Sequence, residues 1–141
     1  MKPAVEKGLE QLRKHFIGSE VSIKEDGNGG AYVMVDSVDL GPCYSEETRH
    51  TWIGFHLAYN YPIPDIYPHH TRHDLTRADG AALPAGMHVG NNFTGFDRPS
   101  VMISRRTTES SSWIDQTAVA KLLKIIEWCG GNIARASDET T

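Results

Sequence analysis

Two stretches of the chain carry apolar residues at the spacing of an amphipathic helix, one near each end. The first stripe consists of Val5, Leu9, Leu12 and Phe16. Pro3 precedes it, in a first turn where the missing N–H of proline costs nothing. The second stripe consists of Val119, Leu122, Leu123 and Ile126, between a capping box over 112–115 and the glycine pair 130–131. The pattern predicts one helix over 3–16 and another that ends at Gly130.

Between these helices the pattern changes to the alternation typical of strands. Residues 21–23 alternate and 31–38 are rich in strand-forming types, while Asp26–Gly30 between them tolerate positive φ, so these segments predict a hairpin. A third strand is predicted over Thr51–Tyr59. Its more apolar face consists of Ile53, Phe55, Leu57 and Tyr59. The sequence therefore predicts an antiparallel meander after the first helix.

Prolines and glycines interrupt this pattern in the second half of the chain. Pro62 and Pro64 end the third strand, because proline removes donors from the ladder and fixes φ. Residues 66–73 favour a short edge strand, and residues 78–90 a long irregular segment. Irregular segments of that length in a compact domain usually carry function.

The stretch Met87–Trp113 joins a polar, glycine-containing loop to a short apolar run and a Ser/Thr-rich connection. At its centre Ser100 follows Pro99 and precedes the apolar residues 101–103. This order predicts that Ser100 lies at a loop edge, on the rim of the site in which the apolar residues are buried. We expect the upstream elements to be a scaffold for this stretch.

The composition excludes several classes of function. A chain of 141 residues suffices for one domain with its own core, which we expect over 1–131, followed by a flexible polar tail over 132–141. The net charge is −4 and there are no long charged runs, so the sequence lacks the basic cluster that would attract nucleic acid or an anionic membrane. No apolar stretch reaches the roughly 20 residues of a membrane span, and none resembles a signal peptide. We therefore expect a cytoplasmic protein.

Neither the cysteines nor the glycines indicate a cofactor. Cys43 and Cys129 lie far apart without CxxC spacing, which argues against a disulfide framework and a structural zinc site. The glycine-rich run 27–30 lacks the lysine of a phosphate loop and belongs to the predicted hairpin. We expect reduced thiols, no metal and no cofactor.

The order of the elements and several short motifs resemble the ubiquitin-conjugating enzyme (UBC) family. Residues 61–64, Tyr-Pro-Ile-Pro, are similar to the Tyr-Pro-x-x-Pro-Pro motif that ends the third strand there, in a compressed form without the final Pro-Pro. Asn92 precedes Ser100 by eight residues, as the asparagine of the family's His-Pro-Asn motif precedes its catalytic cysteine. The run 100–103 resembles the Cys-Leu-x-Ile that follows, and Trp113 resembles the tryptophan before the next helix.

The resemblance implies an α+β fold with an N-terminal helix, an antiparallel meander of about four strands, a long irregular active-site segment and a C-terminal helix. It is greatest to short bacterial members found beside cGAS-like nucleotidyltransferases in CBASS anti-phage operons. It implies a transferase of antiviral defence that carries a protein C-terminus as a thioester at position 100. The implied partner is a ubiquitin-like modifier or the C-terminal tail of such a nucleotidyltransferase, with or without an activating enzyme.

The resemblance also assigns roles around position 100. Residue 100 takes the acyl group, and the side-chain amide of Asn92 donates to the developing oxyanion. His88 is a candidate for proton transfer, because imidazole titrates near neutrality, and Asp97 and Asp115 are alternative bases. Gly90-Asn91 stands where the family has His-Pro, so Asn91 is an alternative to Asn92.

Serine in place of cysteine makes position 100 a poor nucleophile, because a hydroxyl needs an adjacent base and no Ser-His-Asp motif is visible. Ser100 therefore indicates either an engineered Cys→Ser substitution in a transferase, which we favour, or a natural UBC-fold module that binds the partner without transferring it. The transferase interpretation needs the hydroxyl to be accessible and near the asparagines.

A third interpretation is a small metal-dependent hydrolase built on the histidine-rich run 69–74. The candidate ligands are His69, His70, His73 and Asp74. Adjacent histidines on a regular strand point to opposite faces, and no recognised zinc spacing is present, so we favour a strand without metal. Cys43 is the other conceivable nucleophile, but no motif accompanies it.

Overall fold

The computed structural model describes residues 1–106 and 117–139, of which residues 132–139 are described by their backbone alone. Its elements are α1 (Pro3–His15), β1 (Val21–Glu25), β2 (Ala31–Asp39), β3 (His50–Leu57), β4 (His69–Arg72), β5 (Met87–Phe93), β6 (Arg98–Ile103) and α2 (Ala118–Glu139). The six strands form one antiparallel sheet in the order β1-β2-β3-β4-β6-β5. The α+β class is confirmed, and the expectation of about four strands was too low.

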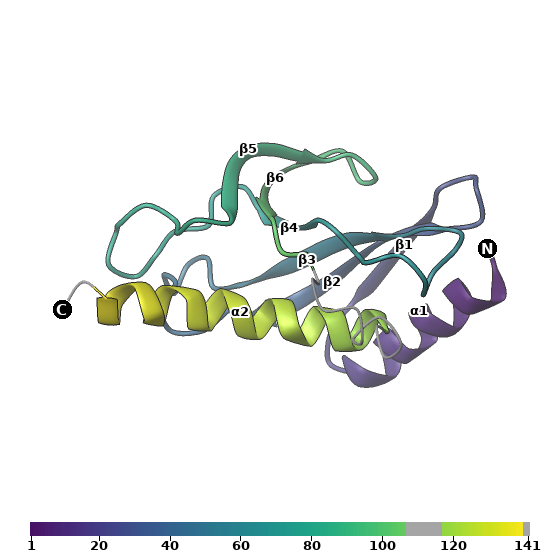
Figure 1. Cartoon of the computed structure of the whole chain (residues 1–141), viewed down its shortest axis with the longest axis horizontal. Helices are drawn as coiled ribbons and strands as arrows, with labels where there is room; N and C mark the ends of the chain where they lie inside the picture. The colour runs from purple at the N-terminus through teal and green to yellow at the C-terminus, as the bar shows by residue number, and fades with distance from the viewer. Residues whose placement is uncertain (107–116, 140–141) are drawn as a thin grey trace.

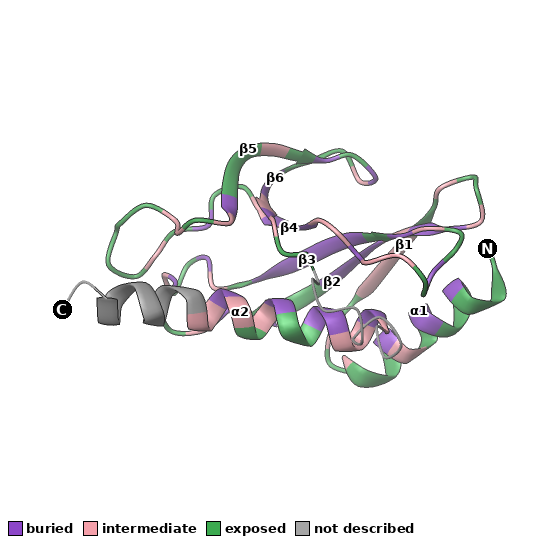
Figure 2. Cartoon of the chain, viewed as in Figure 1, coloured by how far each residue is buried: buried purple, intermediate pink, exposed green. Residues whose placement is uncertain are grey.

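The two helices lie on one face of the sheet, and the β5–β6 hairpin rises over the other (Figure 1). The main core lies between the helices and the sheet, where fully buried residues of β2 and β3 meet apolar residues of α1 and α2 (Figure 2). Its largest fully buried members include Leu9, Leu12, Phe55, Leu57, Leu122 and Ile125. Neither helix has the length and apolar composition to cross a bilayer over the residues described.

The first helix is confirmed nearly to its predicted ends. Val5, Leu9 and Leu12 are buried, and Pro3 occupies its first turn as expected. Gly8 faces the ring of Tyr61, where a Cβ would lie 2.9 Å from Tyr61 Cε1, so α1 and the segment after β3 pack closely. Phe16 N–H bonds back to the Leu12 carbonyl at 2.9 Å and closes the helix.

The second helix differs from the prediction in its end and its buried face. It continues through Gly130 and Gly131 to Glu139, so these glycines do not end it, and 132–139 extends the helix. Leu123 is 41% exposed, whereas Lys121 is 3% exposed and faces inward. A charged residue therefore takes a buried position that the apolar stripe did not predict.

At its start, α2 is capped by residues other than the predicted ones. Thr117 Oγ1 accepts the Ala120 N–H at 3.1 Å, and Tyr61 OH accepts the Ala118 N–H at 2.8 Å. The predicted capping box over 112–115, with Trp113, lies outside the described residues.

The β1–β2 hairpin and β3 are confirmed. Asp26 Oδ1 accepts the N–H groups of Asn28 and Gly30 at 2.7 and 3.0 Å, which shapes the turn between β1 and β2. Ile53, Phe55 and Leu57 are fully buried on the helix-covered face, as the alternation predicted. A bulge in β2, with Ser37 at φ 59°, shifts the register against β3 between Val35 and Val38.

Two predictions for the second half of the chain were wrong. β4 is an interior strand between β3 and β6, and not an edge strand, because β6 returns from about 30 residues further along the chain to pair with it. The range 78–90 is not irregular throughout, since β5 begins at Met87. Residues 78–86 lie outside helices and strands, as expected, whereas 87–90 belong to the β5–β6 hairpin that supplies the last two strands.

This hairpin covers the outer face of the sheet with an aromatic cluster. The outer cluster consists of Tyr32, Met34, Trp52, Phe93 and Phe96. Phe93 sits against Gly54 of β3 so closely that a Cβ at Gly54 would overlap its ring. The absence of a side chain at Gly54 therefore lets the hairpin lie flat on the sheet.

Candidate functional site

Ser100 lies within β6 and not at a loop edge, which corrects the prediction. It pairs with Arg72 of β4 on one side and Asn91 of β5 on the other. Strands on both sides and the outer cluster above leave Ser100 0% exposed. The proline before it is accommodated because Pro99 stands next to the end of the strand, where a missing donor matters least.

The hydroxyl of Ser100 is hydrogen-bonded to a histidine. Ser100 Oγ and His70 Nδ1 are 2.8 Å apart, and the Phe93 ring stacks on His70 with centroids 5.1 Å apart. Burial lowers the pKa of His70, so its imidazole is neutral at neutral pH. A hydroxyl beside a neutral imidazole has the geometry of an activated nucleophile, but this one has no exposed surface on which to meet a substrate.

The asparagine that the sheet places opposite Ser100 is Asn91 and not the predicted Asn92. Asn92 pairs with Pro99 and is exposed, and alternation along the strands places it on the other face of the hairpin from Ser100. Asn91 is opposite Ser100, but its amide donates to the His88 carbonyl at 3.0 Å. His88 is exposed, opposite Met102. The predicted set of Ser100, Asn92 and His88 does not converge on one reacting centre.

The alternative bases are no nearer to such a centre. Asp97 is exposed in the β5–β6 turn, with φ 48°. Asp115 lies outside the described residues.

The histidine-rich run divides between the two faces of the sheet. His69 is 0% exposed on the helix-covered face, with its ring centroid 5.2 Å from that of Phe55, while His70 lies on the outer face. Asp74 is held by Arg72 through two bonds of 2.6 and 2.9 Å. Among the residues described, no three His, Cys, Asp or Glu side chains lie close enough to hold a metal ion.

His69 has an unusual environment. Neither of its ring nitrogens has a hydrogen-bond partner in the part of the chain described. Burial, with the Lys121 charge as a smaller contribution, lowers the pKa of His69 to about 3. A buried neutral imidazole whose nitrogens have no partner among the described residues lowers the stability of the core.

The structure contains a largely buried ion pair between Lys121 and Asp65, which the sequence pattern did not predict. Lys121 Nζ lies 3.0 Å from Asp65 Oδ1 and donates to the Arg105 carbonyl at 3.1 Å. The sequence contained one sign of this pair, because Lys121 stands among the apolar residues of α2. A lysine in such a helix usually occupies a solvated position. The bond to Arg105 fixes the backbone just beyond β6 against α2.

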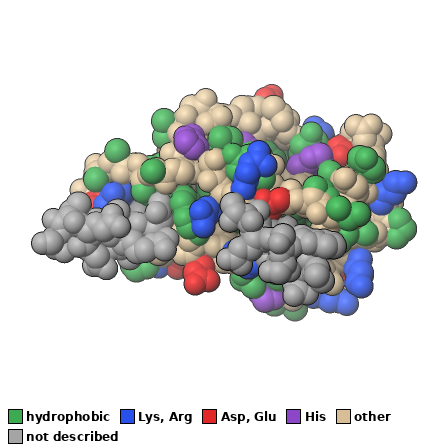
Figure 3. All heavy atoms as spheres, in the orientation of Figure 1, with side chains coloured by type: hydrophobic (Ala, Val, Ile, Leu, Met, Phe, Trp, Pro, Cys, Tyr) green, Lys and Arg blue, Asp and Glu red, His purple; other side chains and the backbone are tan. Residues whose placement is uncertain are grey.

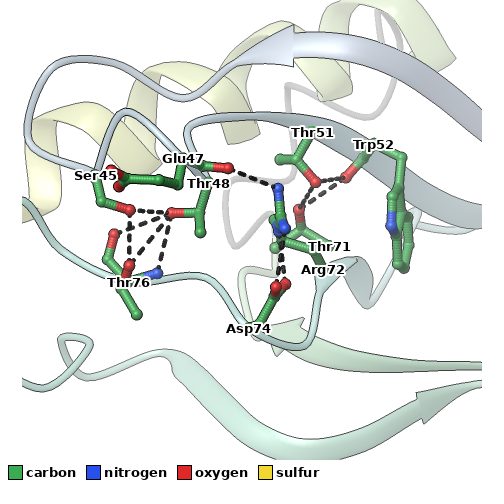
Figure 4. Close-up of polar contacts among 9 residues, drawn as sticks. All are labelled: Ser45, Glu47, Thr48, Thr51, Trp52, Thr71, Arg72, Asp74 and Thr76. Atoms are coloured by element: carbon green, nitrogen blue, oxygen red, sulfur yellow. Dashed lines mark hydrogen bonds and ion pairs between the residues drawn. The ribbon is translucent and has the colours of Figure 1, made fainter.

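A second polar network joins the loop before β3 to the segment after β4 (Figure 4). Its centre is Ser45, whose Oγ lies 2.6 Å from Thr48 Oγ1 and 2.7 Å from Thr76 Oγ1. Arg72 donates to the Glu47 carbonyl at 3.2 Å. Because these groups form hydrogen bonds with one another, we interpret the network as a structural contact that holds the two loops together.

The cysteines offer no alternative nucleophile of the predicted kind. Cys129 is fully buried, and burial raises the pKa of its thiol to about 12. Cys43 is half-buried and packs against the main core. Both are free thiols, and reactivity at the buried Cys129 requires the surrounding core to open.

The visible surface carries no single-sign patch that would select a polyanion. Figure 3 shows basic and acidic side chains intermixed on one face of the molecule. An open groove of about 470 Å³ lies between the helices, lined by Gln11, Lys14, His15, Thr117 and Val119.

Comparison of the chain with known protein families, with curated proteins and with solved structures found no match.

Proposed function

We propose that this chain is a non-catalytic binding protein with an architecture similar to the UBC fold. It holds the C-terminal tail of a ubiquitin-like modifier, or of a cGAS-like nucleotidyltransferase in anti-phage defence, without carrying that tail as an ester or thioester. The observation that carries the proposal is the burial of Ser100, whose hydroxyl is 0% exposed and hydrogen-bonded to His70.

The arrangement of the elements supports the UBC-like part of the proposal. An N-terminal helix leads into the antiparallel strands β1 to β4, and a Tyr-Pro segment after β3 packs on that helix. The last helix returns to the same face of the sheet (Figure 1). The β5–β6 hairpin lies where the resemblance implied an open active-site segment, and position 100 is buried within its second strand.

A second candidate is the thioester transferase itself, with Ser100 in place of cysteine. The contact that favours it is the Ser100–His70 hydrogen bond, since a base beside the nucleophile is what such a step needs. This function requires the hairpin to lift from the outer face, because the attacking atom must reach a carbonyl carbon.

The two candidates differ in the accessibility of a thiol at position 100. We expect Ser100→Cys, in a Cys43→Ser background, to react with an excess of dithionitrobenzoate at least about a hundredfold more slowly than a free thiol, because reaction waits for opening of the hairpin. Asn92→Cys in the same background is the matched control, since Asn92 is exposed on the same hairpin. It should react at the rate of an exposed cysteine.

Loading provides the direct test. Ser100→Cys incubated with ubiquitin, an activating enzyme and ATP, and separately with the cGAS-like nucleotidyltransferase, should give no reductant-sensitive adduct on a non-reducing gel. A reductant-sensitive adduct, or a thiol in the Ser100→Cys variant that reacts as fast as the one in the Asn92→Cys control, overturns the binding proposal in favour of the transferase.

A further inference from the structure

Just beyond β6, an arginine and two hydroxyl groups from distant parts of the chain come together. Tyr67 OH and Ser104 Oγ are 2.6 Å apart. The guanidinium carbon of Arg106 lies 3.8 Å from the centre of the Tyr67 ring, so the cation stacks on this aromatic face. The hydroxyl pair is partly buried, whereas Arg106 is exposed.

Within the described residues, this cluster has hydrogen-bond donors left over. Two hydroxyl groups hold two hydrogens, and their mutual bond uses only one of them. Arg106 adds its planar array of N–H donors, and within 1–106 and 117–139 no carboxylate forms an ion pair with it. The donors therefore exceed the acceptors, which is the condition for binding an anion.

The backbone that carries these donors is held from several sides. Ser104 N–H donates to the Gly86 carbonyl at 2.8 Å, and the buried Lys121 ammonium donates to the Arg105 carbonyl at 3.1 Å. Arg105 points to another neighbour, with its guanidinium carbon 5.7 Å from the centre of the Trp128 ring. A segment that is ordered before binding loses less entropy when a ligand arrives.

We propose that Arg106, Ser104 and Tyr67 bind a carboxylate, and that this carboxylate is the free C-terminus of the partner's tail. A carboxylate presents two coplanar oxygens that match the guanidinium fork, and it carries the single charge that one arginine neutralises. A phosphate would bring nearly two charges to a site with one exposed cation. The identity of the tail rests on the proposed function, whereas the carboxylate site rests on the geometry alone.

A minimal ligand tests the carboxylate site independently of the partner. N-acetylglycine, titrated into the ¹⁵N-labelled wild-type protein, should shift the Arg106 Nε–H and Ser104 amide NMR signals saturably, and N-acetylglycinamide should not. Phosphate is the competing anion, and it should shift these signals less at equal concentration. Absence of an N-acetylglycine shift, or an equal response to the amide, overturns the site.

A peptide then tests the assignment to a protein C-terminus. A fluorescein-labelled peptide with the C-terminal sequence of ubiquitin should bind the wild-type protein in fluorescence anisotropy, and its C-terminal amide should bind about tenfold more weakly. Arg106→Gln should lose the same factor for the free acid and show no preference between the two peptides. Tyr67→Phe keeps the ring under Arg106 and should lose only a few-fold in affinity.

Arg98→Gln is the matched control. Arg98 is also an exposed arginine near an aromatic ring, 5.6 Å from that of Trp52, but it lies at the other end of β6. Its substitution should leave both affinities unchanged. Equal binding of the acid and the amide would exclude recognition of the terminal carboxylate, and it would leave the proposed binding function unaffected. An N-acetylglycine site on a protein that binds neither peptide would retain the site and reject a ubiquitin-like tail.

Discussion

The two faces of the sheet are built from alternate residues of the same strands, yet they are covered by different elements. The helix-covered face buries Ile53, Phe55 and Leu57 of β3 in a large aliphatic core. The outer face of the same strand presents Trp52 and Gly54 to a small aromatic cluster held by one hairpin.

Two adjacent histidines illustrate what this difference means. His70, on the outer face, is hydrogen-bonded to Ser100 and stacked by Phe93. His69, on the helix-covered face, has no partner for either ring nitrogen among the described residues. The polar groups under the hairpin are matched to one another, whereas the main core contains a polar group that it does not satisfy. The larger core has enough apolar burial to tolerate such a defect.

The largest effect should come from removing one phenylalanine on each face. Phe55→Ala should lower the free energy of unfolding by about 3–5 kcal/mol, because it opens a cavity in the main core. Phe93→Ala should lower it less and should release the hairpin locally, since the outer cluster is small. Urea denaturation measures the first effect, and amide hydrogen exchange should accelerate in β5 while β2 and β3 stay protected. Equal loss of protection in all strands after Phe93→Ala would show that the two faces unfold as one unit.

The next effect is the pH dependence caused by His69. Its pKa is lowered to about 3 in the folded protein, against an ordinary value of 6.5, so the unfolded chain binds the proton first as the pH falls. Stability should therefore be unaffected by His69 above pH 6.5 and should fall by up to about 1.4 kcal/mol per pH unit between 6.5 and 4.

Substitution of this histidine should remove that dependence. His69→Leu should flatten the profile in this window and should be more stable than the wild type at pH 5, because it removes a buried group without partners. Asn92→Leu, at an exposed position without a titratable side chain, is the control and should leave the profile unchanged. Urea titrations at intervals from pH 7 to pH 4 provide the measurement, and an unchanged slope in His69→Leu would exclude His69 as its source.

The smallest effect should come from the hydrogen bond under the hairpin. Ser100→Ala should lower the free energy of unfolding by about 1–2 kcal/mol, because the lost bond leaves His70 Nδ1 buried without a partner. A double-mutant cycle with His70→Phe isolates the interaction. A coupling energy near zero would mean that the Ser100–His70 contact does not stabilise the outer face.

The candidate site could be predicted from the sequence only in part. The resemblance directed attention to Ser100, and the register shows that Asn91 and not Asn92 lies opposite it. Asn91 takes this position because the β5–β6 pairing shifts between His88 and Asn91, since the unshifted register would place Gly90 opposite Ser100, and no local pattern records the shift. The Lys121–Asp65 pair and the Tyr67–Ser104 contact join residues 56 and 37 positions apart, respectively, so local spacing could not reveal them.

Local patterns in the sequence specify the individual elements. Helical spacing predicted α1 and the presence of α2, but not the buried face of α2, the turn residues after Glu25 predicted the first hairpin, and alternation in β3 separated its two faces. The interior position of β4, the folding of β5 and β6 over Gly54 and the burial of Ser100 depend on tertiary contacts. The reason is that periodicity records which face of an element is apolar, whereas the partner that covers the face is chosen by contacts between residues distant in the chain.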